Sequence, residues 1–235
     1  MKKKRIIKEK QGEKSMRKLN RKYGKAAISF ALFILVIALV TCVDVAAVGP
    51  AGTTVGLSHL NKGVHDLIGV HMIWYKLTNY LGYLALAAGG VFAVIGLKQL
   101  IERRSLKDVD HEILALGGLF VLLGVIYVLF EKVVVNCRPV LMEGETVPEA
   151  SFPSSHTVLA IVIFGAIAMM LKDYVKDKKT AALLQNICIV LLLVAVIGRL
   201  ISGVHWFTDI LGGIFLSVAL LQTFSGILEK LKKEE

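Results

Sequence analysis

Six stretches of the chain are almost continuously apolar, and most charged residues lie between them or at the two ends. A helix needs about 20 apolar residues to cross the roughly 30 Å hydrocarbon core of a bilayer, and each stretch reaches or approaches that length. The stretches are 26–48, 77–101, 113–135, 154–171, 181–197 and 210–228. This pattern predicts an all-α polytopic membrane protein in which six transmembrane helices form a bundle.

The segments outside these stretches complete the predicted organisation. Residues 1–25 form a basic cytoplasmic tail, either solvated or lying on the membrane surface as a helix. Residues 26–228 form the membrane domain, and 229–235 form a short cytoplasmic C-terminal tail. Within the membrane domain, residues 58–70 mix apolar and polar side chains, which predicts a short interfacial helix.

Composition supports a membrane protein. Hydrophobic residues make up 55% of the chain and the mean hydropathy is +0.67, far above the range of soluble globular proteins. The three cysteines are odd in number and widely spaced, so they predict neither a disulfide framework nor a zinc site. The pairs Gly89-Gly90 and Gly117-Gly118 predict close contacts between helices, because small residues let transmembrane helices approach one another.

The net charge of +10 is concentrated at the N-terminus. Residues 1–25 contain 12 Lys or Arg against Glu9 and Glu13, which is a net charge as large as that of the whole chain. A polybasic segment beside a transmembrane helix sets the topology and contacts anionic lipid. The charge therefore indicates a bilayer surface as the partner and not a nucleic acid.

Lys and Arg alternate between successive connectors. One set of connectors, with the C-terminal tail, carries Lys98, Arg103, Arg104, Lys107, Lys172, Lys176, Lys178, Lys179, Lys230, Lys232 and Lys233. The other three connectors carry only Lys62, Lys76, Arg138 and Arg199. Because positively charged loops remain in the cytoplasm, both termini are predicted to be cytoplasmic and the three poorly charged connectors to lie outside.

Three clusters of polar residues fall on the predicted outer side. They are Arg138-Pro139, the run 153–156 (Pro-Ser-Ser-His), and Arg199 with His205 and Asp209. Charged side chains at the boundary of membrane segments are costly and are functional candidates by default. His205 and Asp209 are four residues apart and share a helix face, so the carboxylate can orient the imidazole as a nucleophile or base.

These residues supply the groups that phosphoryl transfer needs. Arg138 and Arg199 offer guanidinium donors for the phosphate oxygens. Ser154 or Ser155 caps a helix whose N-terminal N–H groups can bind an anion. His156, on the first turn of that helix, is the candidate acid and base. Because the arginines neutralise the phosphate, no metal and no cofactor is expected.

The clusters resemble the three motifs of the type-2 phosphatidic acid phosphatase superfamily, which are integral-membrane phosphatases related to vanadium haloperoxidases. Arg138-Pro139 matches the end of the first motif, and 153–156 matches the second, Pro-Ser-Gly-His, with serine for glycine. The stretch from Gly198-Arg199 through His205 to Asp209 matches the third, with glycine for serine. The resemblance implies the six-helix fold of that family, a nucleophilic His205, an acid/base His156 and an orienting Asp209.

The first motif departs from the family pattern. The family's lysine falls seven residues before the arginine, where this chain has Glu131, and Lys132 is one position late. Lys132 is rotated about 100° from that face of a helix. Either a local bulge brings Lys132 to the phosphate, the role assigned to it here, or Glu131 pairs with Arg138. A carboxylate facing the phosphate would weaken or alter the site.

The remaining polar residues on the outer side carry no spacing signal. They are expected to be interface or loop residues: Asp44, His65, Asp66, His71, Glu143, Glu145 and Glu149.

The function expected from the whole pattern is a plasma-membrane phosphatase with an extracytoplasmic site. It hydrolyses a lipid phosphate or diphosphate through a phosphohistidine, the candidates being phosphatidic acid, phosphatidylglycerophosphate and a polyprenyl diphosphate. The oligomeric state has no signal in the sequence.

Two functions from other classes also fit this pattern of residues. One is a phosphotransferase that passes the phosphoryl group to a lipid or glycan acceptor. The other is a catalytically silent protein that binds lipid phosphates, which the glutamate at position 131 motivates. A vanadate-dependent peroxidase is disfavoured by so hydrophobic a chain.

Overall fold

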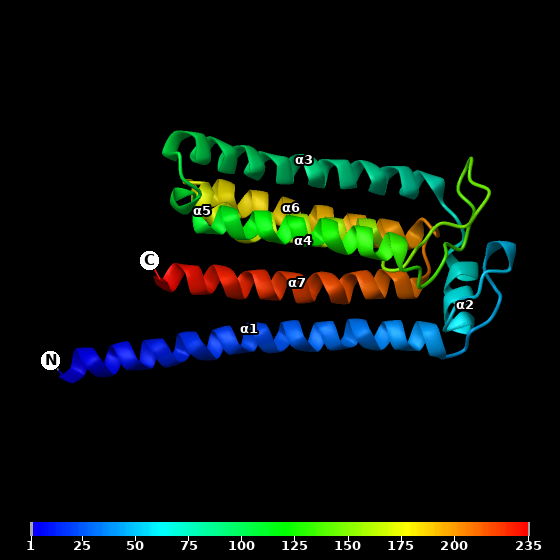
Figure 1. Cartoon of the computed structure of the whole chain (residues 1–235), viewed down its shortest axis with the longest axis horizontal. Coiled ribbons are helices and arrows are strands. Elements are labelled where there is room, and N and C mark those ends of the chain that lie inside the picture. The colour runs from blue at the N-terminus through cyan, green and yellow to red at the C-terminus, as the bar shows by residue number, and fades with distance from the viewer. Residues whose placement is uncertain (1, 235) are drawn as a thin grey trace.

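The computed structural model describes residues 2–234, with side chains between 12 and 232. The helices are α1 (Lys2–Cys42), α2 (Ser58–Ile68), α3 (Met72–Arg103), α4 (His111–Lys132), α5 (Ser155–Tyr174), α6 (Lys178–Ile201) and α7 (Phe207–Glu234), with short 3-10 turns at Pro50–Gly52 and Leu106–Asp108. Six helices of the described chain, all except α2, are long and apolar enough to cross a membrane. The predicted all-α, six-helix fold is confirmed (Figure 1).

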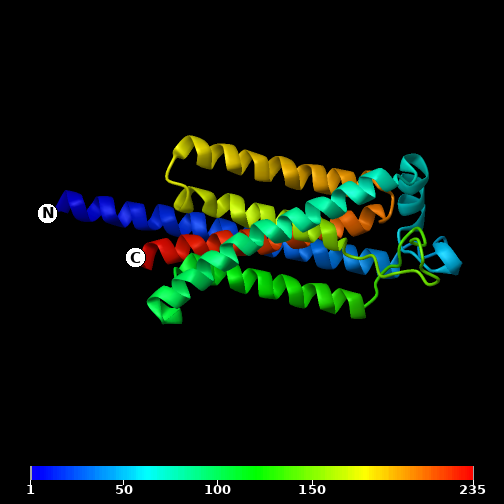
Figure 2. The ribbon, with the colours of Figure 1, turned by 90° about the horizontal axis from the view of Figure 1, so that it is seen from above.

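The six long helices run roughly side by side, and their connections separate into two ends (Figures 1 and 2). Both termini and the α3–α4 and α5–α6 connections lie at one end. The α1–α3 segment with α2, the α4–α5 loop and the α6–α7 turn lie at the other. All three polar clusters therefore gather at the end far from the termini, which we call the site end.

Helix α5 is the centre of the bundle. Most of its side chains are buried, and it packs against α3, α6 and α7. Helix α1 lies along α7 instead, on the outside of the bundle. Among the six long helices described, α5 has the largest buried share, so its first turn, which carries His156, is firmly supported.

The basic N-terminal segment is helical and continuous with the first span. Helix α1 runs without a break from Lys2 to Cys42. Near its middle, the Lys22 ammonium lies 2.6 Å from the Glu229 carboxylate and donates to the Ser225 carbonyl at 3.0 Å. At least this part of the basic segment packs on α7, and Lys22 is not solvated as predicted for the tail.

The glycine pairs behave differently from the prediction. A Cβ at Gly89 would lie 3.1 Å from the Phe120 ring, which is a close helix contact as predicted. At Gly90, Gly117 and Gly118 a Cβ would meet nothing within 4 Å. These three glycines leave space along α3 and α4 and do not bring the helices together.

Helix α2 is present where an interfacial helix is predicted, and it crosses the site end of the bundle (Figure 1). Asp44 holds its N-terminus: the carboxylate accepts the Ser58 hydroxyl and the His59 N–H, each at 2.9 Å. The hydrogen bond from the His59 N–H, with the nearby His59 ring, keeps the pKa of Asp44 below its ordinary value. Asp44 is therefore a capping residue and not a free loop residue.

Candidate active site

The tight turn between α6 and α7 carries His205. Its side chain is 2% exposed, and its Nδ1 lies 3.6 Å from the Asp209 carboxylate, one helical turn later. Asp209 is completely buried and accepts the Trp206 N–H at 2.9 Å and the Asn136 amide at 3.3 Å. These two donors fix the carboxylate, so the predicted pairing of His205 with Asp209 is present in the fold.

The surroundings of His205 favour the neutral imidazole. Burial, and then the positive charges of Arg199 and Arg138, hold the pKa of His205 well below its ordinary value near 6.5. Neither ring nitrogen has a hydrogen-bond partner within the described residues. A neutral ring with Nδ1 facing Asp209 leaves the lone pair of Nε2 free to attack an electrophile.

Arg199 links three helices behind this turn. It is 1% exposed, and its guanidinium donates to the Thr78 hydroxyl and the Asn79 side-chain oxygen of α3, each at 3.0 Å. It also lies 2.9 Å from Nδ1 of His156 on α5. A guanidinium can only donate, so Nδ1 of His156 accepts and the proton of the neutral ring is on Nε2. A neutral His156 becomes a general acid only when a second proton makes it an imidazolium.

The structure explains one departure from the family motif. A Cβ at Gly198 would lie 2.8 Å from the Trp74 ring and 2.9 Å from the Thr78 methyl group. The space that the family's serine would need is therefore filled by two side chains of α3. The glycine that precedes Arg199 lets α3 approach closely enough for Thr78 to bind the guanidinium.

Arg138 is held by the loop that follows it. Its Nε lies 2.6 Å from the Glu149 carboxylate, and its backbone N–H donates to the Glu149 carbonyl at 2.9 Å. Glu149 is therefore the ion-pair partner of Arg138, which corrects both its assignment to a solvated loop and the suggested pairing of Arg138 with Glu131. The Nη1 atom of Arg138 is buried without a hydrogen bond among the described residues.

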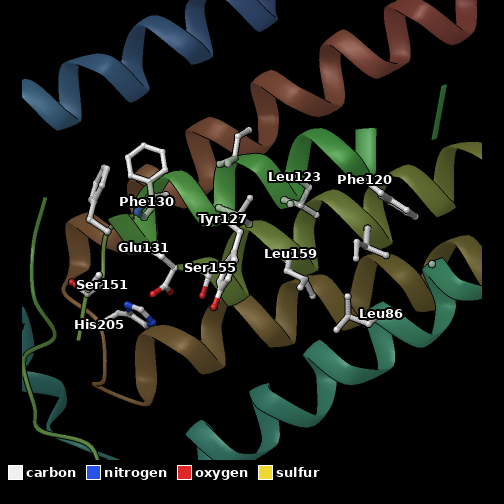
Figure 3. Close-up of a pocket in the computed structure, with 18 of the residues that line it drawn as sticks. Leu86, Phe120, Leu123, Tyr127, Phe130, Glu131, Ser151, Ser155, Leu159 and His205 are labelled. Carbon is white, nitrogen blue, oxygen red and sulfur yellow. The ribbon is translucent and has the colours of Figure 1, made fainter. Parts of the chain in front are cut away.

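A cavity of about 340 Å³ begins at His205 and extends between α3, α4 and α5 (Figure 3). Its polar end is lined by His205, Ser155, Arg138 and Glu131. The rest of its wall is mostly apolar and includes Leu86, Leu123, Phe130 and Leu159. A polar end with a long apolar extension is the shape that a phosphorylated lipid requires.

The two predicted serines occupy different environments. Ser155 lines the cavity, as expected of a phosphate-binding residue. Ser154 is fully buried, accepts the Thr157 hydroxyl at 3.0 Å, and does not line the cavity. Its side chain makes no cap bond, although Ser154 stands at the N-cap position of α5. The prediction that Ser154 binds the phosphate through its side chain has no support in this geometry.

Helical phase decides between the two candidates on α4. The helix continues through Lys132 without a bulge, so Glu131 lines the cavity and Lys132 is exposed outside its wall. Figure 3 shows the Glu131 carboxylate directed toward the same space as His205 and Ser155. Lys132 does not line the cavity, and its assignment to the phosphate stays a prediction.

Several residues of the site carry no recognisable sequence signal. Thr78 and Asn79 hold Arg199, and Asn136 holds Asp209. At Gly82 of α3 a Cβ would lie 3.2 Å from the His156 ring. Asn136 stands two residues before Arg138, which could have suggested it, whereas the α3 residues lie in an apolar stretch far away in sequence. Within the described residues no cluster of His, Cys, Asp or Glu is arranged to hold a metal ion.

Comparison with known proteins agrees with this arrangement. The family model of the PAP2 superfamily matches residues 112–233, which include every catalytic residue suggested above. The chain belongs to the PAP2 superfamily and is a multi-pass membrane protein.

Two related proteins give the comparison more detail. Phosphatidylglycerophosphatase B of Bacillus subtilis (strain 168) is 34% identical over 87 residues, which is 35% of this chain. The match spans 41% of that relative's length. The crystal structure of a transmembrane PAP2-type phosphatidylglycerolphosphate phosphatase from Bacillus subtilis has a TM-score of 0.60 at 21% identity, covering 90% of this chain and 99% of that chain. This second likeness shows a shared fold.

Proposed function

We propose that the protein is a lipid phosphatase that works through a phosphohistidine on His205. The observation that carries this proposal is a convergence of buried polar atoms without hydrogen bonds in the described structure: both ring nitrogens of His205, Nη1 of Arg138 and Nε of Arg199. Buried polar groups are normally paired, and two guanidiniums beside a neutral imidazole suit a phosphate. The name of the curated relative agrees with this chemistry.

The reaction divides into two steps. In the first, Nε2 of His205 forms a bond to phosphorus while the bond from phosphorus to the ester oxygen breaks. The bound phosphate draws Arg199 away from Nδ1 of His156, so His156 gains a second proton and gives one, as an imidazolium, to that oxygen. In the second, a water oxygen attacks the phosphohistidine, His156 takes a proton from the water, and the bond to His205 breaks. Asp209 stabilises the ring of His205 as it becomes positive, and Arg138 and Arg199 bind the phosphoryl oxygens.

The cavity supports a lipid as the substrate. The phosphate would lie at the polar end beside His205, and a hydrocarbon chain would follow the apolar wall between α3 and α4. Phosphatidylglycerophosphate, phosphatidic acid and polyprenyl diphosphates all have this form. The distribution of Lys and Arg supports cytoplasmic termini and a site end that faces outward from the plasma membrane.

The test is phosphate release by the purified protein in detergent micelles with a chelator, using the three lipids above. Replacing His205 with alanine should lower release by at least about 10³-fold, because the variant lacks the proposed nucleophile. His59→Ala is the matched control, since this histidine is exposed on α2 at the same end. A His205→Ala protein that still released phosphate at the wild-type rate would overturn the proposal.

A second readout separates the two alternatives. The phosphoenzyme of the wild type should be trapped by rapid quenching at alkaline pH and be absent from His205→Ala. Phosphoenzyme that persists in water and passes its phosphoryl group to an added alcohol, giving the phosphorylated alcohol, would identify a phosphotransferase. Lipid binding without phosphoenzyme or phosphate release would identify a silent binder.

A further inference from the structure

We propose that Asn61, on the extramembrane helix α2, is a positioning residue for the turn that carries His205; the inference rests on the proposed role of His205. Asn61 does not line the cavity and touches neither catalytic histidine in the described contacts. It would act through Thr208, the residue between the His205 turn and Asp209. This assigns a catalytic purpose to α2, which otherwise contributes no residue to the phosphate site.

The contacts of Asn61 join α2 to the start of α7. Asn61 is completely buried, and its amide donates to the Gly56 carbonyl at 2.8 Å and to the Thr208 hydroxyl at 3.0 Å. Its side-chain oxygen accepts the Thr208 N–H at 3.1 Å. The first N–H groups of a helix have no partner within the helix. Asn61 supplies one from a segment 147 residues away in the sequence.

The same segment holds the turn at further points. The His71 N–H donates to the Ser202 carbonyl at 3.0 Å, and Nε2 of His65 lies 3.1 Å from the Gly203 carbonyl. Gly203 has a φ of +68°, and a Cβ there would lie 2.0 Å from the Gly69 carbonyl oxygen. Only glycine satisfies both the conformation and the contact. The turn on either side of His205 is therefore enclosed by α2 and the residues that follow it.

This support matters because no side chain in the described part of the protein hydrogen-bonds to the ring of His205. Its Nδ1 is 3.6 Å from Asp209, so the alignment of the pair depends on the backbone between them and not on a bond between their side chains. Thr208 belongs to that backbone, and Asn61 fixes both its N–H and its hydroxyl. A displacement of about 1 Å in a reacting group can cost about 100-fold in rate.

An ordinary stabilising role is the competing explanation. If Asn61 only satisfied buried polar groups, its removal would lower the unfolding temperature and the yield of folded protein, and the folded fraction would turn over at the normal rate. If Asn61 positions the turn, kcat of the folded protein falls while KM stays nearly constant, because Asn61 contacts Gly56 and Thr208 and none of the residues that bind the phosphate. Measuring kcat per folded enzyme therefore distinguishes the two roles, because only a positioning role lowers it.

The experiment compares Asn61→Ala, Thr208→Val and the double variant by kcat, KM and unfolding temperature in detergent micelles, with the lipid phosphate that the wild type hydrolyses best. Thr208→Val keeps the backbone N–H and loses only the hydroxyl contact. We expect kcat to fall about 30-fold in Asn61→Ala and about 5-fold in Thr208→Val, with KM within about twofold. Because the two residues act as one unit, the double variant should be no slower than Asn61→Ala.

Asn186→Ala is the matched control, since this asparagine is exposed on α6 and should leave kcat unchanged. Unchanged kcat per folded enzyme in both single variants would overturn the inference, and so would losses that multiply in the double variant. If Asn61→Ala does not fold, the kcat of Thr208→Val decides alone. An active wild type that loses nothing in Asn61→Ala would leave the proposed function standing, whereas a wild type without phosphoenzyme would remove both.

Discussion

Helices α4 and α5 follow one another in the chain and have similar lengths, 22 and 20 residues, yet their environments are opposite. Among the 18 most apolar consecutive residues of each helix, 22% are buried in α4 and 67% in α5. Helix α4 is nevertheless the more hydrophobic of the two, with a mean hydropathy of 2.7 against 1.8. In a bilayer, lipid solvates apolar side chains as well as a protein core does, so hydrophobicity does not report burial.

The glycines of the two helices show the same difference. A Cβ at Gly165 of α5 would lie 2.6 Å from Leu221 of α7, which makes this glycine a close helix contact. At Gly117, Gly118 and Gly124 of α4 a Cβ would meet nothing within 4 Å. Helix α5 thus supports the catalytic histidine by close packing, whereas α4 forms one wall of a space for a ligand.

The largest effect is expected from a substitution that disrupts the packing of α5 against α7. Gly165→Leu should destabilise the protein by about 3 kcal/mol or prevent folding, because α5 would have to move away from α7. Gly118→Leu on α4 is the matched substitution and should be neutral or stabilising by up to about 1 kcal/mol, since leucine is the better helix former. Thermal unfolding in detergent measures both. Equal losses in the two variants would contradict the assignment of a packed and an open helix.

The next prediction concerns the motif position on the packed side of the site. Gly198→Ser restores the family's residue but places a Cβ 2.8 Å from Trp74 and 2.9 Å from Thr78. The displacement of Thr78 should misalign Arg199 and lower kcat/KM about 10-fold, or about 1.4 kcal/mol. Kinetics with the best lipid substrate test this, with Gly118→Ser as a control. An increase in activity would show that α3 can move to accommodate the serine without misaligning Arg199.

Restoring the family's residue at position 131 of α4 should improve the enzyme, in contrast to position 198. Glu131→Lys replaces a cavity-facing carboxylate with an ammonium, and the exposed end of α4 can accommodate the change. We expect KM for phosphatidic acid to fall about 5-fold, which is about 1 kcal/mol of added attraction. Lys132→Ala, outside the cavity wall, should leave KM unchanged. A larger effect from Lys132→Ala than from Glu131→Lys would restore Lys132 to the site.

The smallest effect is expected along the apolar wall. Gly124→Leu adds a side chain to the cavity lining, so KM should rise about 3-fold for a long-chain lipid phosphate and stay constant for a short-chain analogue. Gly118→Leu adds the same side chain outside the lining and should change neither value. A chain-length effect equal in the two variants would show that the hydrocarbon chain does not use this cavity.

The sequence predicts the fold and the centre of the site because both depend on short spacings. Apolar stretches long enough to cross a bilayer define six helices, and the four-residue spacing of His205 and Asp209 places them on one helix face. The alternation of positive charge then brings three polar clusters to one end. Within α4 the cavity-lining residues Leu123, Tyr127 and Glu131 are four positions apart, so helical phase explains why Glu131 faces the cavity in place of Lys132.

The supports of the site could not be predicted in this way. Asn61 and Thr78 reach it from other elements across more than 100 residues of sequence, and neither belongs to a spaced motif. Glu149 pairs with Arg138 because the loop folds back on itself, which has no periodic signal. The close contacts predicted at Gly117 and Gly118 of α4 are absent, because a small residue in the sequence fits a close helix contact and an open groove equally well.

The cavity wall has exposed members on the flank of the bundle, among them Leu86 on α3 and Tyr127 on α4, each 53% exposed. A lipid that enters through this flank arrives by diffusion within the membrane plane and never leaves the bilayer. Turnover would then follow the mole fraction of the lipid phosphate in the membrane and not its concentration in the bulk suspension. Diluting the substrate with inert phospholipid, at a constant total amount of substrate, should slow the enzyme in proportion.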